Sequence, residues 1–257
     1  MPIPRHREII GLLHACGECS VEHLAQSFGV SPMTIRRDLN ALAESGQVIR
    51  THGGAAPAEA VMFEFQFLRR AKLNASAKDR IGAAAASLVR DGQSVLLDSG
   101  TTTLCIARHL RERSGITVIT TSLPIASVLQ HAGGVQTLLL GGYVRREAPD
   151  LQGPLTESNL ESLRADIAFI GADGIDENGT CYNASLTVAR MLGKMIQAAQ
   201  QVYVVADASK LGRTALASFG QLADFSGLIT DATAPTPVRD TRVNLITADV
   251  AKEIVHG

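Results

Sequence analysis

Short apolar runs alternate with longer segments of helical periodicity from about residue 77 onward. The apolar runs end at Gly, Asp or Thr, and their pattern predicts strands at 94–98, 117–120, 135–141, 167–171, 202–207, 227–231 and 243–247. The segments between them predict helices at 78–89, 102–113, 123–131, 155–163 and 185–199. Strands that alternate with helices indicate βαβ units, so we expect the α/β class with a mostly parallel sheet.

The first 57 residues follow a different pattern, in which shorter helical segments are separated by turn residues. Ser20 is placed to cap a helix that carries apolar residues on one face, at positions 21, 24, 25 and 28. Gly29 suits the left-handed end of that helix. Ser31 and Pro32 then begin a second helix, because Ser is a preferred N-cap and Pro costs nothing at the first position.

The second helix buries residues 35, 39 and 42 and turns arginines outward. A helix ending in Gly, a short turn and a capped second helix make a helix-turn-helix, whose second helix enters the major groove of DNA. Residues 47–54 follow as a strand and a tight turn, which is typical of a wing. Guanidinium groups pair with guanine or phosphate, and hydroxyls donate to phosphate. We expect the DNA-contacting residues to be Ser20, Ser31, Met33, Thr34, Arg36, Arg37, Asn40, Arg50 and His52.

A helical hairpin with a solvated charged face would fit the same pattern. Residues 1–58 hold five Arg, no Lys and five acidic residues, so this segment is formally neutral. Three of the arginines, Arg36, Arg37 and Arg50, nevertheless fall on the predicted reading elements. Their clustering favours DNA binding over a solvated face.

A composition change near residue 55 separates the two patterns. Residues 53–60 are small and include a proline, which indicates a wing tip or a linker. Phe63, Phe65 and Phe67 follow at a spacing of two, which predicts an extended piece with one buried face. We therefore predict a winged helix-turn-helix DNA-binding domain at 1–57, a linker at 58–76 and an effector-binding and oligomerisation domain at 77–257.

Composition narrows the class of protein. The chain has 257 residues, of which 46% are hydrophobic and 19% charged, enough for a real core in one or two domains. It has no run of 18 uncharged apolar residues and no apolar signal segment at its start, so we expect no membrane span and a cytoplasmic location. The net charge is −1, so nucleic-acid binding requires a local basic surface.

Four cysteines in a chain of this length do not make a disulfide framework. His14, Cys16, Cys19 and His23 have the composition of a zinc site. However, His23 falls inside a predicted helix, and all four ligands would have to converge across the start of that helix. We therefore favour small core thiols and expect no metal or cofactor, while Cys181, in a predicted loop, could be exposed.

Polar residues gather after several of the predicted strands. Asp98 ends one strand, and the following run of Ser, Gly and three Thr opens a helix, an arrangement that cradles anions without being a Walker A loop. Ligands bind at the carboxyl ends of strands in open α/β sheets, where hydroxyls, carboxylates and a Lys would suit a phosphorylated polyol. We expect the effector-binding residues to be Asp98, Ser99, Gly100, Thr101, Thr102, Thr103, Thr121, Gly141, Asp173, Asp176 and Lys210.

Residues 20–55, SVEHLAQSFGVSPMTIRRDLNALAESGQVIRTHGGA, resemble the DNA-binding region of the DeoR family of bacterial transcriptional regulators. The segments LDSGTTT, LLLGGYVRR, ADIAFIGADGID and VVADASK occur in the order of that family's sensor domain, which is similar in fold to ribose-5-phosphate isomerase. The resemblance spans about residues 5–231. It implies a regulator, typically a repressor of a carbohydrate-metabolism operon, controlled by a phosphorylated sugar or related metabolite.

The chain departs from the family pattern at two places. Thr121 stands where the family commonly has Asn, and Leu192 stands near the position of a family Lys. An apolar residue there removes a cation that could pair with phosphate, unless Arg190 or Lys194 replaces it. The identity of the effector is therefore less well indicated than the existence of its site.

Two classes of function fit these observations. The first is a sequence-specific regulator that binds double-stranded operator DNA as a homodimer or homotetramer, since one helix-turn-helix touches few base pairs. The alternative is a sugar-phosphate isomerase-like enzyme with an appended helical domain, which could recruit Asp98, Asp173 and Asp176. The regulator is favoured because the segment after GADGID lacks a Glu–Lys pair and an enzyme leaves the N-terminal domain unexplained.

Overall fold

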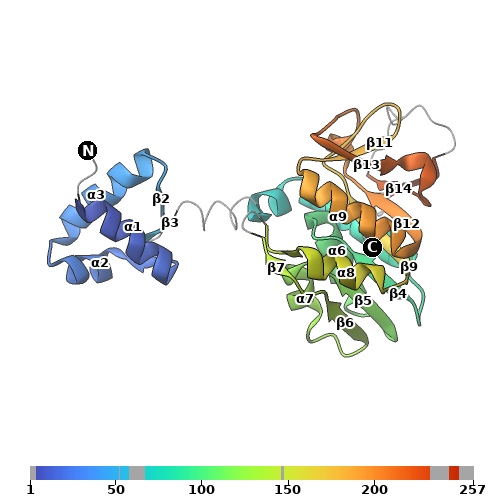
Figure 1. The fold of residues 1–257 in the computed structure, drawn as a ribbon, viewed down its shortest axis with the longest axis horizontal. Helices are drawn as coiled ribbons and strands as arrows, with labels where there is room; N and C mark the ends of the chain where they lie inside the picture. The colour runs from blue at the N-terminus through green and yellow to red at the C-terminus, as the bar shows by residue number, and fades with distance from the viewer. Residues whose placement is uncertain (1–3, 52, 58–66, 146–147, 232–242, 249–257) are drawn as a thin grey trace, which may run out of the picture. The chain divides into compact units, whose positions relative to one another are not determined.

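The computed structural model describes residues 4–51, 53–57, 67–145, 148–231 and 243–248 (Figure 1). The chain divides into two compact units, Met1–Arg69 and Arg70–Gly257. This division falls inside the predicted linker, while the boundaries at 57 and 77 stay predictions. Phe63 and Phe65 lie outside the described residues. Phe67 begins a helical stretch at 67–72, so the prediction of an extended piece is wrong at that residue.

The first unit contains three helices and a small sheet. Its helices are α1 (Pro4–Cys16), α2 (Val21–Phe28) and α3 (Pro32–Glu44). Gly29 takes the left-handed conformation after α2 with a φ of 62°, which a residue with a side chain adopts only at a cost. The turn between α2 and α3 is therefore the one that the sequence predicts for a helix-turn-helix.

Three short strands complete this unit: β1 (Cys19–Ser20), β2 (Val48–Arg50) and β3 (Gly54–Pro57). Both pairings are antiparallel, and β3 lies in the middle. The prediction of a wing tip or linker is thus wrong for residues 54–57, which form the central strand. A side chain at Gly54 would lie 2.1 Å from the carbonyl oxygen of Cys19, so the close pairing of β1 and β3 requires glycine there.

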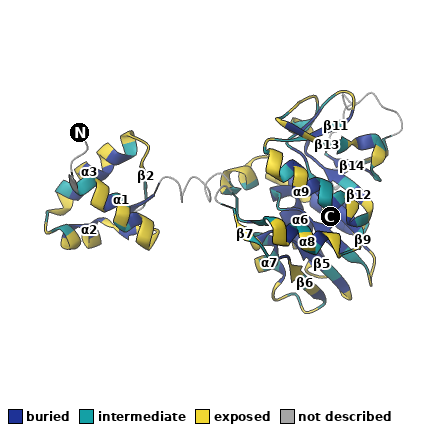
Figure 2. Ribbon diagram, viewed as in Figure 1, coloured by how far each residue is buried: buried dark blue, intermediate teal, exposed yellow. Residues whose placement is uncertain are grey.

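Apolar residues from all three helices and the sheet form the core of the first unit. The fully or nearly fully buried members include Ile9, Leu13, Leu24, Ile35, Leu39, Leu42 and Val48. These are the positions at which the helical periodicity places apolar side chains on one face. The remaining faces of α2 and α3 are largely exposed (Figure 2).

The second unit is built on a seven-stranded parallel sheet in the order β15-β14-β12-β9-β4-β5-β6. Its strands are β4 (Ser94–Leu97), β5 (Ile116–Thr120), β6 (Val135–Leu139), β9 (Ala165–Gly171), β12 (Ala199–Val205), β14 (Gly227–Thr230) and β15 (Leu245–Thr247). Each predicted strand therefore has a counterpart, and the α/β class is confirmed.

The helices of this unit are α5 (Ala75–Ser87), α6 (Thr101–Leu110), α7 (Leu123–Leu129), α8 (Pro154–Glu161) and α9 (Leu186–Gln197). From β4 the order runs one way through β5 to β6, and from β9 it runs the other way through β12 to β14. Because parallel crossovers are right-handed, the connecting helices α6 and α9 fall on opposite faces of the sheet. The order reverses between β4 and β9, and open α/β sheets bind ligands at such a reversal.

Helix α9 packs its apolar residues on the sheet. Met191, Leu192 and Met195 belong to the same buried cluster as Leu96 of β4 and Ile170 of β9. Helix α8 lies against α9 (Figure 1). These contacts place one face of α9 directly beside the carboxyl ends of the central strands.

Two small pieces of sheet have no counterpart in the sequence prediction. One is the antiparallel hairpin of β7 (Tyr143–Val144) and β8 (Leu151–Gln152). The other is an antiparallel sheet of β10 (Gly174–Ile175), β11 (Thr180–Asn183) and β13 (Ala217–Gln221). Two short 3₁₀ turns, Ala208–Lys210 and Leu222–Asp224, lie before and after β13 along the chain. Among the described residues, no helix is long and apolar enough to cross a membrane.

Candidate nucleic-acid interface and ligand pocket

Helix α3 presents the predicted DNA-contacting strip at the surface of the first unit. Its buried side carries Ile35, Asp38, Leu39 and Leu42. The opposite side is exposed and carries four of the predicted residues, namely Met33, Arg36, Arg37 and Asn40. Met33 is 70% exposed, so its side chain is accessible for contact with a thymine methyl group. The structure thus brings these four residues together on one face.

The predicted hydroxyls at the helix starts act as caps. Ser31 accepts a hydrogen bond from the backbone N–H of Thr34 at 3.2 Å, and the two hydroxyls lie 2.9 Å apart. Ser20 accepts from the backbone N–H of His23 at 3.1 Å in the same way. Ser20 and Ser31 are exposed and Thr34 is half-buried. Their contact with DNA phosphates stays a prediction, while their role in starting α2 and α3 is visible in the structure.

Asp38, on the buried side of α3, is held by two residues of α1. Its carboxylate accepts from Arg5 Nε at 2.6 Å and Nη2 at 3.1 Å, and it lies 3.2 Å from His6 Nε2. Burial favours the neutral acid, but the hydrogen bonds and charge of Arg5 outweigh it and lower the pKa of Asp38. This contact fixes the recognition helix to α1.

The ion pair of Arg5 with Asp38 changes which charges of the first unit are free to bind DNA. Arg5 and Asp38 neutralise each other. Arg36 and Arg37 are exposed and make no hydrogen bond or ion pair with another described residue. A formally neutral segment therefore still presents unpaired guanidinium groups on the exposed strip of α3, as binding to a phosphate backbone requires.

The wing is described only in part. Arg50 lies in β2, is half-buried, and its Nη1 has no hydrogen-bond partner among the described residues. The hydroxyl of Thr51 is also buried and has no hydrogen-bond partner among the described residues. His52 lies outside the described residues. Because this unpartnered donor is buried, it does not support a DNA contact, and the contact of Arg50 with DNA stays a prediction.

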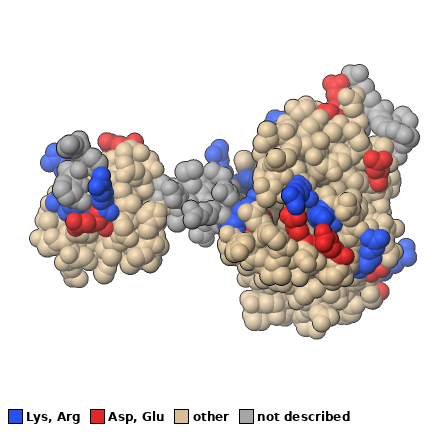
Figure 3. All heavy atoms as spheres, viewed as in Figure 1, with Lys and Arg blue, Asp and Glu red and all other residues tan. Residues whose placement is uncertain are grey.

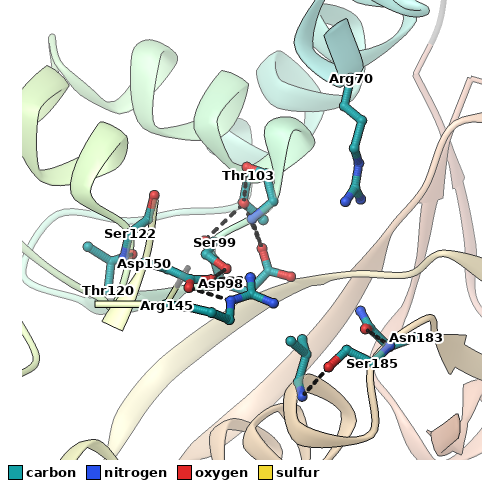
Figure 4. Close-up of polar contacts among 12 residues, drawn as sticks. Arg70, Asp98, Ser99, Thr103, Thr120, Ser122, Arg145, Asp150, Asn183 and Ser185 are labelled. Carbon is teal, nitrogen blue, oxygen red and sulfur yellow. Dashed lines mark hydrogen bonds and ion pairs between the residues drawn. The ribbon is translucent and has the colours of Figure 1, made fainter. Parts of the chain in front are cut away.

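In the second unit, Asp98 lies at the strand-order reversal and joins its two sides. Its carboxylate accepts from Gly171 N of β9 at 2.7 Å, from Gly100 N at 2.8 Å and from Thr103 Oγ1 at 2.7 Å (Figure 4). The residue is only 7% exposed. Burial raises the pKa of Asp98, although these hydrogen bonds and the charge of Arg70 favour the carboxylate. Asp98 therefore ties two strand ends together.

The three threonines open helix α6. Gly100 is the N-cap and supplies no side chain, so no side-chain cap hydrogen bond forms at this end. Thr101 and Thr102 are buried, and Thr103 is fully buried and bonded to Asp98. The positive end of the helix dipole therefore lies next to Ser99 and Asp98.

A small polar cavity adjoins this helix end. Ser99 Oγ donates to the carboxylate of Asp150. Arg145 donates to the same carboxylate from Nε at 2.8 Å and from Nη2 at 2.7 Å (Figure 4). The cavity has a volume of about 30 Å³. It is lined by Asp98, Ser99, Thr121, Arg145, Asp150, Leu151, Gln152, Val188, Met191, Leu192 and Met195.

Helix α9 supplies the apolar wall of this cavity. Leu192, which departs from the family pattern, is buried in that wall. Neither Arg190 nor Lys194 lines the cavity, because each pairs with an acid of α8: Arg190 with Glu157 at 2.8 Å and Lys194 with Glu161 at 2.7 Å. Charged side chains of both signs lie together over this part of the surface in Figure 3. Neither residue therefore replaces the missing cation at the cavity.

A second group of predicted residues meets the chain where it enters the sensor. Asp173 pairs with Arg70 Nη2 at 2.9 Å, and Arg70 is 58% exposed. Asn74 Nδ2 donates to Asp207 at 2.9 Å. Lys210 lies at the end of the adjoining 3₁₀ turn and makes no side-chain hydrogen bond to another described residue.

Lys78 of α5 holds the segment at residues 70–74, in which the chain enters the sensor. It is buried, and its ammonium donates to the carbonyl oxygens of Leu73 at 2.8 Å and of Arg70. Burial lowers the pKa of Lys78. The last turn of the helical stretch 67–72 is therefore anchored to α5.

Of the predicted effector-binding residues, Asp98, Ser99 and Thr121 line the cavity. Asp176 and Gly141 are among those that lie away from it. Asp176 accepts from the backbone N–H groups of Asn178 and Thr180 and from the hydroxyl of Tyr182, so it stabilises the turn between β10 and β11. Burial favours its neutral form, but these hydrogen bonds lower the pKa of Asp176. Gly141 lies against α8, where its carbonyl accepts from Thr156 Oγ1 at 2.6 Å. Neither lines the cavity described above.

The cysteines differ in their surroundings. Cys19, Cys105 and Cys181 are buried, and Cys16 is exposed. The suggestion that Cys181 could be exposed is wrong: it lies in β11, and burial raises the pKa of its thiol to about 12. Cys16 is not a core thiol, in contrast to the expectation. Within the described ranges, no group of three or more His, Cys, Asp or Glu side chains is placed to hold a metal ion.

Sequence reasoning missed four residues of these sites: Arg70, Asn74, Arg145 and Asp150. Arg145 lies in the LLLGGYVRR segment, which carried part of the family resemblance, so a signal was available. Asp150 gave no such signal, because its importance arises from the β7–β8 hairpin that brings it onto Arg145. Asn74 has a φ of 53° without being glycine, which marks a position held by specific contacts.

Comparison with known proteins agrees with both units. Residues 5–60 match the DeoR-like helix-turn-helix domain, and residues 73–232 match the DeoR C terminal sensor domain. The glycerol-3-phosphate regulon repressor of Escherichia coli K12 is 33% identical over 91% of this chain and 92% of its own length. The transcriptional repressor GlcR of Bacillus subtilis is 37% identical over 87% of this chain and 86% of its own length.

A solved structure, ribose 5-phosphate isomerase A from Methanocaldococcus jannaschii, covers 54% of this chain and 55% of its own at 22% identity, with a TM-score of 0.41. A similarity of this size carries no argument about activity. Both of these relatives are named as repressors of transcription, which favours the regulator over the isomerase-like alternative. With both of its parts matched, this DNA-binding chain belongs to the DeoR family of transcriptional regulators.

Proposed function

We propose that this regulator represses an operon of carbohydrate metabolism and that a phosphorylated sugar or polyol releases it from its operator. One observation carries the proposal: Asp98, Ser99, Thr121 and the first turn of α6 meet at the strand-order reversal of a sensor linked to a DNA-reading unit. Hydroxyls, a helix N-terminus and a nearby arginine suit an anionic, hydroxylated ligand. The E. coli relative is named for glycerol 3-phosphate, which belongs to this class.

The contacts of the entry segment support a route from ligand to DNA. Arg70 and Asn74 hold the start of the sensor against Asp173 and Asp207, and both carboxylates lie just after central strands. A ligand that drew on these carboxylates would loosen the segment through which the chain continues to the reading unit. Coupling between two such sites is typically about 1–3 kcal/mol.

We further propose that the protein acts as a homodimer or homotetramer. A single recognition helix reads few base pairs, and regulators of this type reach operator affinity by pairing two reading heads on two half-sites. Light scattering of the full chain after gel filtration measures the oligomeric state directly. A monomer in the presence of operator DNA would contradict the pairing.

The central test joins both parts of the proposal. Selection of bound fragments from genomic DNA gives the operator, and fluorescence anisotropy then follows its release by sugars and their phosphates, tested in pairs. Release by one phosphorylated compound but not by its unphosphorylated parent supports the proposal. If no phosphorylated compound changes operator affinity, the effector belongs to another chemical class, and the DNA-binding assignment is unaffected.

A further inference from the structure

The cavity beside helix α6 contains an arginine paired with a carboxylate of the same hairpin. Arg145 and Asp150 form a two-pronged contact, with Nε on one carboxylate oxygen and Nη2 on the other, at 2.8 and 2.7 Å. The side chains are 15% and 7% exposed. This is the geometry with which arginine also binds phosphate and free carboxylate ligands.

A third donor reaches the same carboxylate from a different part of the chain, the loop after β4. Ser99 Oγ, at the end of β4, bonds to Asp150 Oδ2, the oxygen that also accepts from Arg145 Nη2. Ser99 precedes the uncapped first turn of α6. An arginine fork, a serine hydroxyl and a helix N-terminus thus surround one anionic group, and in the structure that group is the side chain of Asp150 (Figure 4).

The charges that line the cavity and its small volume also indicate a site for one anionic group. Of the residues that line it in the described part of the chain, Arg145 alone carries a positive charge, because α9 contributes Val188, Met191, Leu192 and Met195. The volume of about 30 Å³ holds roughly one water molecule. A phosphate group that accepts from all three donors lies where the carboxylate of Asp150 now lies, because Arg145 Nε, Arg145 Nη2 and Ser99 Oγ all donate to that carboxylate.

We propose that Arg145 and Ser99 bind the anionic group of a phosphomonoester effector, and that the Asp150 carboxylate holds the same place and competes with it. The inference rests on the proposed function and names the groups that take the phosphate. Arg145 supplies the cation that α9 lacks at Leu192. Displacement of Asp150 sets the affinity, because an effector binds only as far as its phosphate outcompetes a carboxylate tethered next to Arg145.

Removal of the competing charge gives the sharpest test. Asp150→Asn keeps the shape of the side chain but leaves Arg145 without a counter-charge, so inorganic phosphate is expected to bind at least about tenfold more tightly than to the natural chain. Arg145→Gln is expected to reduce phosphate binding at least about tenfold. Ser99→Ala removes one neutral donor, so its expected loss is smaller, about threefold.

Matched controls separate this site from a general change of charge. Glu157→Gln and Arg190→Gln alter the exposed α8–α9 ion pair by the same charges and are expected to leave phosphate affinity unchanged. The double variant Arg145→Gln/Asp150→Asn removes both charges of the buried ion pair together, so neither is left without its partner and the variant is expected to fold even if a single variant does not. It is expected to bind no phosphate.

Calorimetric titration of each full-length variant with inorganic phosphate, and with ribose 5-phosphate against ribose, gives the affinities, and thermal unfolding without phosphate verifies folding. Tighter binding in Asp150→Asn with loss in Arg145→Gln and in the double variant supports the inference. Equal affinities in all variants, or no binding even by Asp150→Asn, overturn it. The proposed function fails separately, when no phosphorylated compound releases operator DNA.

Discussion

The arginines on the exposed strip of α3 and those at the sensor sites differ in whether they have a carboxylate partner. Arg36 and Arg37 project from α3 into solvent with no partner among the described residues. Arg70 and Arg145 in the sensor are each paired with a carboxylate of the same unit. The exposed pair is ready for a large polyanion that needs no pocket, whereas the paired arginines favour ligands able to displace a carboxylate. The comparison separates a surface that is predicted to contact DNA from a site at which we propose that a ligand displaces a carboxylate.

The largest expected effect tests the exposed side of this comparison. Arg37→Ala removes a guanidinium from the strip that is predicted to contact DNA, at an expected cost of about 2 kcal/mol per half-site. With two half-sites the loss of specific binding approaches a thousandfold, as measured by anisotropy with operator DNA. The thermal unfolding midpoint stays unchanged, because the Arg37 side chain is exposed and unpaired.

Arg111→Ala is the matched control for that experiment. It removes the same charge from an exposed position at the end of α6, in the other unit. Its operator affinity is expected to equal that of the natural chain. Equal affinities for Arg37→Ala and Arg111→Ala would mean that α3 is not the reading element.

The contrast between the strip on α3 and the sensor site also shows which features the sequence could predict. The strip on α3 follows from helical periodicity, since Ile35 and Leu39 on the buried side leave Arg36 and Arg37 on the other. The strands of the large sheet are short and mostly apolar, as is typical of a parallel sheet covered on both faces. Local pattern was therefore sufficient for the reading helix and for the seven-stranded sheet.

The contacts of the sensor site depend on distant parts of the chain. Asp150 meets Ser99, 51 positions earlier, and Asn74 meets Asp207, 133 positions later. The strands β7, β8 and β10 have two residues each, too few to show an alternating pattern. Asp176 was expected at the ligand because it ends a polar motif, yet it holds a turn. Such roles are decided by tertiary packing.

The next effect tests whether the contact of Asn74 with Asp207 couples effector binding to the release of DNA. Asn74→Gly keeps the left-handed backbone accessible at φ 53° and removes only the hydrogen bonds to Asp207 and Ser209. Operator affinity without effector is expected to change little. The release caused by an effector falls about fivefold, the lower end of typical coupling energies.

Lys72→Ala, a change at an exposed position in the same segment, is the control and is expected to keep the full response. Asn74→Ala differs from Asn74→Gly only by the strain of a left-handed alanine, so it reports stability apart from coupling. Full effector release in Asn74→Gly would remove the entry segment from the route between the two sites.

A smaller effect concerns Asp38, which is paired with Arg5 in the first unit. Asp38→Asn loses the charge that holds Arg5, and we expect about 1 kcal/mol of destabilisation, limited because Arg5 is partly exposed and screened by water. The pKa of Asp38 is lowered on folding, so its contribution is present above the ordinary aspartate pKa of about 3.9 and is lost as the pH falls through the lower, folded value.

Hydrogen exchange of the α1 and α3 amides against pH measures this contribution locally. Between pH 7 and about pH 4 the natural chain is expected to exceed Asp38→Asn in protection, with the gap closing at more acid pH. Asp91→Asn, at an exposed position before β4, is the control. A gap that stays constant down to the most acid pH would show that packing, and not the charge of Asp38, fixes α1 to α3.

The smallest effect separates the two roles of Ser31. As the N-cap of α3 it accepts from Thr34 N, and as an exposed hydroxyl beside the recognition helix it is predicted to contact phosphate. Ser31→Asp keeps the cap, since Asp caps as well as Ser, but places a negative charge toward the DNA backbone. Stability is expected to stay unchanged while operator and random DNA both bind about threefold more weakly, the size of one screened charge contact.

Ser31→Ala reverses the pattern, with about 1 kcal/mol less stability and nearly full DNA affinity. Unchanged DNA binding in Ser31→Asp would leave Ser31 as a cap and no more, and would place the phosphate contacts of α3 on its arginines.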